Sequence, residues 1–231
     1  MLALMLLSQP VQAFEVMVKD SGAAMRWPSF PVAWSVNAQN NAGLDPNMAA
    51  VVAQRAAEAW EVDGTAVKLS YLGTTNARTS GHDGQAAVYF VDQEWPWDES
   101  LLAMTSSYSD SSGAFLGFDI AVNTRDHDWA LDGNSELMDL QNTLTHEWGH
   151  VLGLGHSEHD ELATMHASAS PGEVHKRDLS QDDINGLFQI YAAEVDIPMA
   201  GCTAIPKSPK GMVWLGVLAS ILLINRRRAS S

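Results

Sequence analysis

The chain has 231 residues, with 13 Lys and Arg against 28 Asp and Glu, and therefore a formal net charge of -15 at pH 7. Nucleic-acid binding is excluded as the function of so acidic a chain, because contacts to phosphates need Lys and Arg. The one cysteine, Cys202, permits no intramolecular disulfide, and it lies outside the segment that we expect to form the domain, residues 14–196. The length suits one domain with a hydrophobic core plus short appendages.

The first 13 residues, MLALMLLSQPVQA, predict a secretory signal peptide. An apolar stretch is followed by Val11 and Ala13, small residues of the kind that precede a cleavage site. The stretch has no Lys or Arg at its start, so either the signal is minimal or the true start lies upstream of Met1. A buried N-terminal strand is the alternative interpretation. We favour export, with the mature chain beginning at residue 14.

Apolar patterns and turn residues predict the elements of the domain in chain order. A strand bounded by prolines is expected over residues 24–37, and a helix follows with Asp45 as N-cap and Pro46 at the first helical position. The apolar stripe of this helix is expected at Met48, Val51, Val52, Ala56, Ala59 and Trp60. Further strands are expected at 67–71, 86–91 and 115–122, with a shorter and more exposed one at 101–108. Together with two later helices, these elements predict an α+β domain.

Residues 146–156, HEWGHVLGLGH, carry the strongest functional signal of the chain. His146 and His150 lie four residues apart, so on a helix they project from one face and can bind one Zn²⁺. Glu147 lies beside them, where its carboxylate can take a proton from a zinc-bound water. Gly153 can adopt a positive φ, which lets the chain turn back and bring His156 to the metal as a third ligand. Three protein ligands plus one open position are typical of a catalytic zinc site.

A lone histidine on an apolar helix face usually belongs to the core, so any single histidine of the pattern could have a structural role instead of binding a metal. The five specified residues together are expected by chance in only about 10⁻⁵–10⁻⁴ of chains of this length. Apolar residues also follow helical spacing here, at Leu144, Trp148, Val151 and Leu152. The sequence therefore predicts a zinc centre with Glu147 as the general base.

Two features follow the third histidine. Met165 lies nine residues beyond His156. A methionine can fill an apolar gap, and directly under a zinc site it can form the floor. Ser180 predicts the N-cap of a last helix, and we assign Asp182 and Asp183, in its first turn, to structural support. The apolar face of that helix is expected at Ile184, Leu187, Phe188 and Tyr191.

These motifs resemble the metzincin metalloproteases, in which HExxHxxGxxH is followed by a methionine turn, here Met165. Within the metzincins the chain is most similar to the matrixins. Ser157 follows the third histidine, the spacing to the methionine is short, and residues 179–191, LSQDDINGLFQIY, are close to the matrixin closing helix. The segments RWP at 26–28, AW at 59–60 and DIAVN at 119–123 also look matrixin-like. The resemblance covers roughly residues 25–192.

The resemblance implies a metzincin catalytic domain with a twisted, mostly parallel sheet of about five strands, a zinc-binding helix and a C-terminal helix. It implies a zinc endopeptidase that holds one catalytic Zn²⁺ and hydrolyses extracellular proteins or peptides. Substrate peptides in this family lie extended along a sheet edge, which here would be residues 101–108. Residues 166–178 lack the usual Tyr-Pro that walls the specificity pocket, so the substrate preference stays undetermined. We expect a monomer.

The residues offer less support for other metals and for a role without catalysis. A second zinc could draw only on His82, Asp83 and the distant His127, and no residue pattern supports Ca²⁺. A catalytically silent, metzincin-like surface binding module is the alternative function. Its expected mark would be the loss of Glu147 or of one zinc ligand, and all four residues are present.

The C-terminal tail has three expected parts. Residues 197–211 form a linker with a Gly-Cys motif at Cys202, residues 212–225 a short hydrophobic membrane segment, and residues 226–231 a basic tail. An apolar run followed by arginines is typical of membrane insertion, although about 20 residues are needed to span a bilayer core. A short transmembrane anchor and a buried C-terminal helix are two possible interpretations.

The tail also resembles the MYXO-CTERM sorting tails of bacterial surface proteins, in which the helix is transient and the cysteine is the point of processing and lipid attachment. This second resemblance implies contact with bacterial export and C-terminal processing machinery. It further implies that the secreted protein is retained at the cell surface or outer membrane through a modified Cys202.

Overall fold

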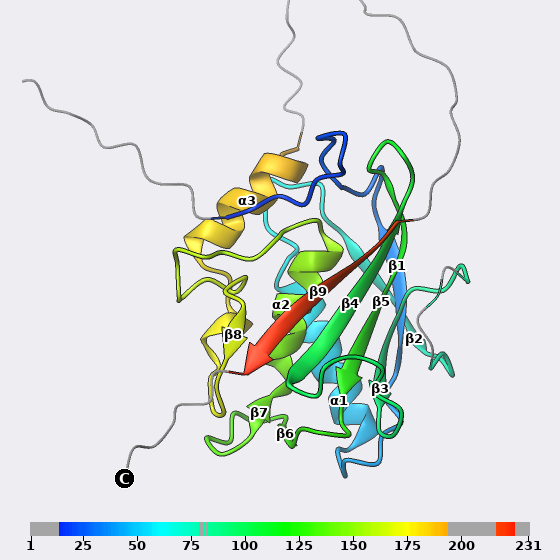
Figure 1. The fold of residues 1–231 in the computed structure, drawn as a ribbon, viewed down its shortest axis with the longest axis vertical. Helices are drawn as coiled ribbons and strands as arrows, with labels where there is room; N and C mark the ends of the chain where they lie inside the picture. Colours follow the sequence, from blue (N-terminus) through cyan, green and yellow to red (C-terminus); the bar gives the residue numbers. More distant parts are fainter. Residues whose placement is uncertain (1–13, 79–80, 82, 194–215, 225–231) are drawn as a thin grey trace, which may run out of the picture.

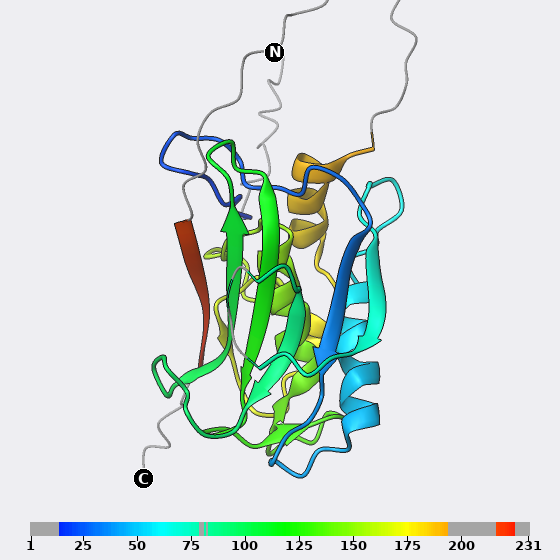
Figure 2. The ribbon, with the colours of Figure 1, turned by 90° about the vertical axis from the view of Figure 1, so that its right-hand side faces the viewer.

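The computed structural model describes residues 14–78, 81 and 83–193, and the backbone of residues 216–224 (Figures 1 and 2). The described elements follow in the order β1 (Val32–Asn37), α1 (Pro46–Glu58), β2 (Leu69–Thr74), β3 (Ala87–Val91), β4 (Leu101–Ser109), β5 (Phe115–Asn123), β6 (Trp129–Ala130), β7 (Met138–Asp139), α2 (Leu140–Val151), β8 (Ser168–Ala169), η1 (His175–Arg177), α3 (Gln181–Tyr191) and β9 (Gly216–Ile224).

The main sheet has the strand order β2-β1-β3-β5-β4-β9-β8 among the described residues. Strands β2, β1, β3 and β5 are parallel, and β4 is antiparallel to β5. The first five strands in this order form the mostly parallel sheet of about five strands that the resemblance implies, so the predicted α+β fold is confirmed. Strands β9 and β8 extend that sheet beyond β4.

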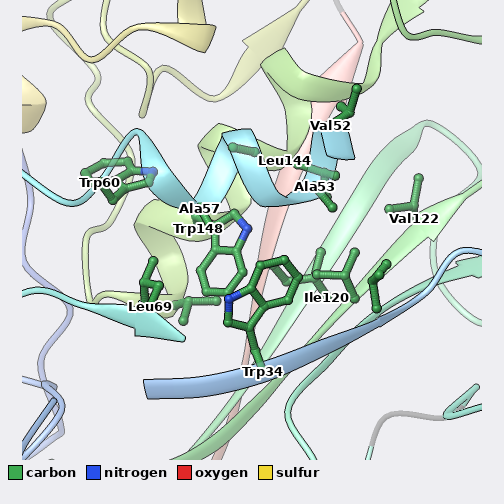
Figure 3. Close-up of a cluster of buried hydrophobic side chains, with 14 of the residues drawn as sticks. Trp34, Val52, Ala53, Ala57, Trp60, Leu69, Ile120, Val122, Leu144 and Trp148 are labelled. Atoms are coloured by element: carbon green, nitrogen blue, oxygen red, sulfur yellow. The ribbon is translucent and has the colours of Figure 1, made fainter. Parts of the chain in front are cut away.

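Helices α1 and α2 pack on one face of this sheet, where the large aromatic side chains interlock (Figure 3). The ring centroid of Trp148 on α2 lies 4.8 Å from that of Trp34 on β1 and 5.1 Å from that of Phe118 on β5. The indole of Trp60, just after α1, donates a hydrogen bond of 2.8 Å to the carbonyl of Thr145 on α2. The zinc-motif helix is therefore fixed to the sheet on one side and to α1 on the other.

Helix α1 begins as predicted, because Asp45 accepts a hydrogen bond of 2.8 Å from the Met48 amide and Pro46 opens the helix. Its buried face differs from the expected stripe. Met48 and Val51 are exposed, and the buried residues are Ala49, Val52, Ala53, Ala56 and Ala57. Small side chains let the helix approach α2 and the sheet closely, and the two larger residues consequently face solvent.

The prediction for residues 101–108 was wrong in its exposure. Strand β4 has nine residues and every one of them is buried, including Thr105, Ser106 and Ser107. Strand β5 pairs with one edge of β4 and β9 pairs with the other, while α2 lies near it. The expected strand over 24–37 also starts later, at Val32, since Pro28 and Pro31 lack the amide hydrogen that a sheet ladder needs.

The apolar part of the tail is extended in this structure. Residues 216–224 form β9, a strand, where the sorting-tail resemblance implies a transient helix. A strand edge offers a row of amide and carbonyl groups to any extended segment, and β9 pairs with the edge of β4 that β5 leaves open. Cys202 and the signal segment 1–13 lie outside the described residues. Among the helices that the structure describes, none is long and apolar enough to cross a membrane.

Candidate metal centre

Helix α2 carries the first half of the zinc motif. It begins at Asp139, whose side chain accepts a hydrogen bond of 2.8 Å from the Asn142 amide. It ends near Gly153, which has a φ of 93°. A Cβ atom at Gly153 would overlap the carbonyl oxygen of Met25, so both the backbone conformation and the close approach require glycine. From this turn the chain runs back to His156.

His146, His150 and His156 come together as the sequence predicts. Their ring centroids are 4.7 Å, 5.2 Å and 4.9 Å apart, and the three candidate ligand nitrogens lie within 4.8 Å of one another. The Nε2 atoms of His146 and His150 are 3.1 Å apart. Two Zn–N bonds of about 2.0–2.1 Å at a tetrahedral angle would hold two nitrogens about 3.3–3.4 Å apart. The spacing therefore fits one Zn²⁺ between the rings.

The opposite ring nitrogens of two histidines are engaged by backbone carbonyls. The Nδ1 atom of His146 lies 2.7 Å from the Thr164 oxygen, and that of His150 lies 2.8 Å from the Leu154 oxygen. A carbonyl accepts a proton from Nδ1, and this leaves Nε2 with the lone pair that a metal needs. Burial lowers the pKa of His146 well below its usual range and that of His150 to about 3, so both rings are neutral. Neutral imidazoles are the form that binds Zn²⁺.

Glu147 lies fully buried beside these rings. Burial raises the pKa of its carboxyl group to about 8, while a hydrogen bond from Thr105 acts in the opposite direction. The Thr105 hydroxyl donates to Oε2, and Oε1 has no hydrogen-bond partner among the described residues. A buried polar oxygen without a partner marks a place for a ligand. A divalent cation at the adjacent histidines would favour the charged carboxylate.

Met165 packs against α2 between the first two histidines of the motif, at Gly149. It is 1% exposed, and its sulfur fills the space where a Cβ at Gly149 of α2 would lie. Two hydrogen bonds from backbone amides fix the turn: the Met165 amide donates to Asp183 Oδ1 at 3.0 Å, and the Ser157 amide donates to the Met165 carbonyl at 2.9 Å. The turn is thus tied both to the third-histidine segment and to α3.

Asp183 and Asp182 have separate structural contacts. Besides Met165, Asp183 accepts hydrogen bonds of 2.8 Å from the Thr164 amide and 2.8 Å from the Ser180 amide, and it is completely buried. Asp182 accepts bonds of 3.0 Å from the Ser157 hydroxyl and 3.0 Å from the Phe14 amide. Signal cleavage after residue 13 would turn that Phe14 nitrogen into a charged ammonium group facing a carboxylate.

Strand β8, which pairs with β9 on the side away from β4, is supported by a buried lysine. The Lys176 ammonium group donates to the Ser168 carbonyl and lies 3.1 Å from a Glu173 carboxylate oxygen. The Lys176 amide donates a bond of 2.9 Å to Asn142 on α2. Burial lowers the pKa of Lys176, and the Glu173 carboxylate opposes that effect. Lys176 consequently links β8 to helix α2.

The sequence analysis did not identify Thr105 or Lys176 as parts of the site. Thr105 was included only as one residue of a strand, and its contact with Glu147 joins positions 42 residues apart. A local pattern carries no signal for such a contact.

A second buried carboxyl group, Asp119 on β5, lies outside the histidine cluster. Burial raises its pKa to about 7, and the nearby Asp83 charge raises it further. Its Oδ2 accepts a hydrogen bond of 3.0 Å from the Gly81 amide and lies 3.5 Å from the Tyr108 hydroxyl. This group titrates in the neutral range without any contact to the three histidines.

Of the other metal candidates, Asp83 and His127 do not assemble with further ligands, and His82 lies outside the described residues. In the part of the chain that the structure describes, His146, His150 and His156 are the only such cluster of three or more His, Cys, Asp or Glu side chains.

Comparison with known proteins agrees with this geometry. The family model described as Matrixin matches residues 26–192. Metalloendoproteinase 1-MMP of Arabidopsis thaliana is 35% identical over 116 residues, which are 50% of this chain and 31% of that protein. Human matrilysin is 37% identical over 87 residues, 38% of this chain and 32% of matrilysin. Human matrix metalloproteinase-27 is 39% identical over 97 residues, 42% of this chain and 17% of that protein.

The alignments with these three relatives thus span about a third of each relative's own length or less. The family match, in contrast, covers most of this chain and includes all three histidines, Glu147 and Met165. The chain therefore belongs to the matrixin family.

Proposed function

We propose that the protein is a zinc-dependent endopeptidase that hydrolyses peptide bonds of extracellular proteins or peptides. The observation that carries the proposal is the cluster of three imidazoles, two of them with Nε2 atoms 3.1 Å apart, beside a buried carboxyl group that has one oxygen without a described partner. A structural zinc site has no need of such a carboxylate, whereas hydrolysis needs a general base.

His146, His150 and His156 would hold the Zn²⁺, with the carbonyls of Thr164 and Leu154 orienting the first two rings. The ion supplies Lewis acidity, which polarises a peptide carbonyl and lowers the pKa of a bound water to about 7.

The protein's own contribution to the reaction is the positioning and proton transfer by Glu147. The Thr105 hydroxyl holds Oε2, which directs Oε1 toward the reacting centre as the acceptor of a proton from the attacking water. Glu147 then delivers that proton to the nitrogen of the leaving amine as the peptide bond breaks. One carboxylate thus acts first as base and then as acid.

Two strands near this carboxylate could pair with a substrate peptide by β-augmentation. One is β4, at the edge that β9 occupies in this structure, and the other is the short strand β8, which pairs with the opposite edge of β9. Ala169 in β8 is buried, and residues 166–178 around it lack the Tyr-Pro that usually lines the specificity pocket in matrixins. Substrate preference should therefore differ from that of relatives with that Tyr-Pro.

The test is a digest of a peptide library by the purified protein under three conditions: as purified, after chelation, and after zinc is restored to the chelated sample. The proposal expects cleavage that disappears with chelation and returns with about one equivalent of zinc. Zinc binding without cleavage of any peptide or unfolded protein would instead favour the catalytically silent binding module.

We further propose that the protein is exported as a monomer and retained at the bacterial cell surface through Cys202. The support is the sequence pattern: the sole cysteine, an apolar run and Arg226–Arg228 follow one another. Lipid attachment through two or more chains anchors a protein stably, whereas one chain does not. Cys202→Ala should shift the protein from the membrane fraction to the medium or trap an unprocessed form. Intact mass spectrometry that finds an unmodified Cys202 on a chain ending at Ser231 would contradict this.

A further inference from the structure

Strand β9, residues Gly216–Ile224, lies between β4 and β8, the two strands that we propose for substrate binding (Figure 1). It pairs antiparallel with β4, from Gly216 opposite Ser109 to Leu223 opposite Leu101. At its end it pairs parallel with β8, where Leu223 lies opposite Ser168 and Ile224 opposite Ala169. The tail segment is therefore the only described part of the chain that bridges β4 and β8.

The register carries β9 across the catalytic carboxylate. Thr105 on β4, whose hydroxyl donates to Glu147, lies opposite Ser220 of β9. The regular pairing with β4 is then interrupted between Ile221 and Leu223, and the pairing with β8 begins at Leu223. The backbone from Ser220 to Leu223 consequently passes the site in an extended conformation, paired first with β4 and then, from Leu223, with β8, as a peptide bound by β-augmentation would be.

We infer that Gly216–Ile224 is an intramolecular competitor of peptide substrates, which keeps the substrate edge occupied while the tail is attached. This inference rests on the proposed endopeptidase function of the same site. Competition follows from strand geometry, since β4 has two edges: β5 occupies one and β9 occupies the other. A substrate peptide can pair with β4 only after β9 has left.

Chain length and charge are compatible with this arrangement. Residues 194–215 connect the described domain to β9, and a chain of that length can extend to about 70 Å. Residues 14–196 carry 8 basic against 28 acidic residues, a net charge of -20, whereas Arg226–Arg228 directly follow the strand. Opposite charge therefore favours a tail held near the domain.

A tethered segment acts at an effective concentration of about 1 mM, so a segment with an intrinsic Kd of about 50 µM would lower kcat/KM about 20-fold. The same residues form the apolar part of the proposed sorting tail. Any event that removes residues 216–224 from the domain, such as tail processing, would free the edge of β4. Occupation by the tail would thus hold the activity down until the tail is removed.

The test uses the full-length chain with the double substitution Ala219→Pro and Ser220→Pro. Adjacent residues of a strand point their amide groups to opposite sides, so this pair of prolines removes one amide that faces β4 whichever side it is on. Ser220→Ala is the matched control, because it changes the side chain and keeps every backbone amide. Hydrogen exchange of β1 and β3 serves as the folding control, since neither strand pairs with β9.

Two measurements need no catalysis and are made on zinc-free protein. The first is hydrogen exchange of β4, where the proline variant should exchange faster at the amides that face β9. The second is binding of a labelled peptide of residues Trp214–Arg228, which should bind the proline variant and not the wild-type chain or the alanine control. Equal peptide binding by the proline variant and the control, with unchanged β4 exchange, would overturn the inference.

The zinc-loaded proteins then separate the inference from the proposed function. The inference expects a kcat/KM about 20-fold higher for the proline variant than for the alanine control. Equal kcat/KM values in the two active variants would overturn it and leave the endopeptidase function intact. Peptide binding to the proline variant alone, without hydrolysis by any variant, would support occupation by the tail and refute the endopeptidase function.

Discussion

Replacement of Asp183 by asparagine should destabilise the domain through the methionine turn. The Asp183 carboxylate is completely buried and accepts three amide hydrogen bonds: one at Oδ1 from Met165, and two at Oδ2 from Thr164 and Ser180. An asparagine has one carbonyl oxygen, which can keep the two bonds at the Oδ2 position. Its NH₂ group then faces the Met165 amide, and two donors oppose each other.

The cost can be worked from these contacts. A buried donor left without an acceptor costs about 1–3 kcal/mol, and the two remaining bonds lose the assistance of the negative charge. We therefore expect Asp183→Asn to lower the free energy of unfolding by about 2–4 kcal/mol. Because the Met165 turn contacts α2 at Gly149 and is hydrogen-bonded to Ser157, next to His156, zinc affinity should also fall, by about 10-fold to 100-fold as for other residues that orient metal ligands.

Urea unfolding of the zinc-free protein measures the first effect, and competition with a chelating dye measures the second. Asp45→Asn is the matched control: Asp45 is exposed, accepts one amide bond at the start of α1, and asparagine is an equally good N-cap. A variant Asp183→Asn that unfolds within about 0.5 kcal/mol of the wild type, as a surface substitution would, refutes the reasoning.

Three further predictions follow from single sites. Gly149→Ala should destabilise the domain by about 1–3 kcal/mol despite the better helix propensity of alanine, since its Cβ would overlap the Met165 sulfur and lie 2.8 Å from Trp60. A second substitution, Met165→Ala, should relieve the overlap. Urea unfolding that shows a more stable Gly149→Ala variant would contradict this prediction. His156→Ala should lower zinc affinity more than about 100-fold together with activity, and full zinc retention in elemental analysis would indicate another third ligand. Burial raises the pKa of Asp119 from an ordinary 3.8 to about 7, so the free energy of unfolding should fall by up to about 4 kcal/mol as pH rises from 4 to 7 and then level off. Asp119→Asn should remove this part of the pH dependence. Parallel pH profiles of the wild type and the variant would disprove it.

The zinc motif could be predicted from the sequence because its determinants are local. His146 and His150 need only helical spacing, and the return to His156 needs only a residue that accepts the positive φ of Gly153. The N-cap residues Asp45 and Ser180 act within one helical turn, and both helices begin where the sequence places them. Local determinants can be read without knowledge of the tertiary fold.

Features that depend on distant partners could not be predicted in this way. The exposed positions of Met48 and Val51 follow from how closely α1 approaches its neighbours, and Phe188 on α3 is likewise more exposed than its helical spacing suggests. The burial of β4 depends on β9, which joins it from more than 100 residues further along the chain. The contact between Thr105 and Glu147 arises from the packing of α2 on β4, which joins positions 42 residues apart.

The most direct test of the zinc peptidase mechanism compares wild type and Glu147→Gln, with zinc content and casein hydrolysis measured on the same samples. The three histidines are unchanged in the glutamine variant, so it should hold one zinc per chain. The neutral amide of glutamine cannot act as the base, so the variant should hydrolyse casein at least about 10²–10⁴-fold more slowly. A variant that carries stoichiometric zinc and still cleaves casein near the wild-type rate would contradict the assignment of Glu147 as the general base.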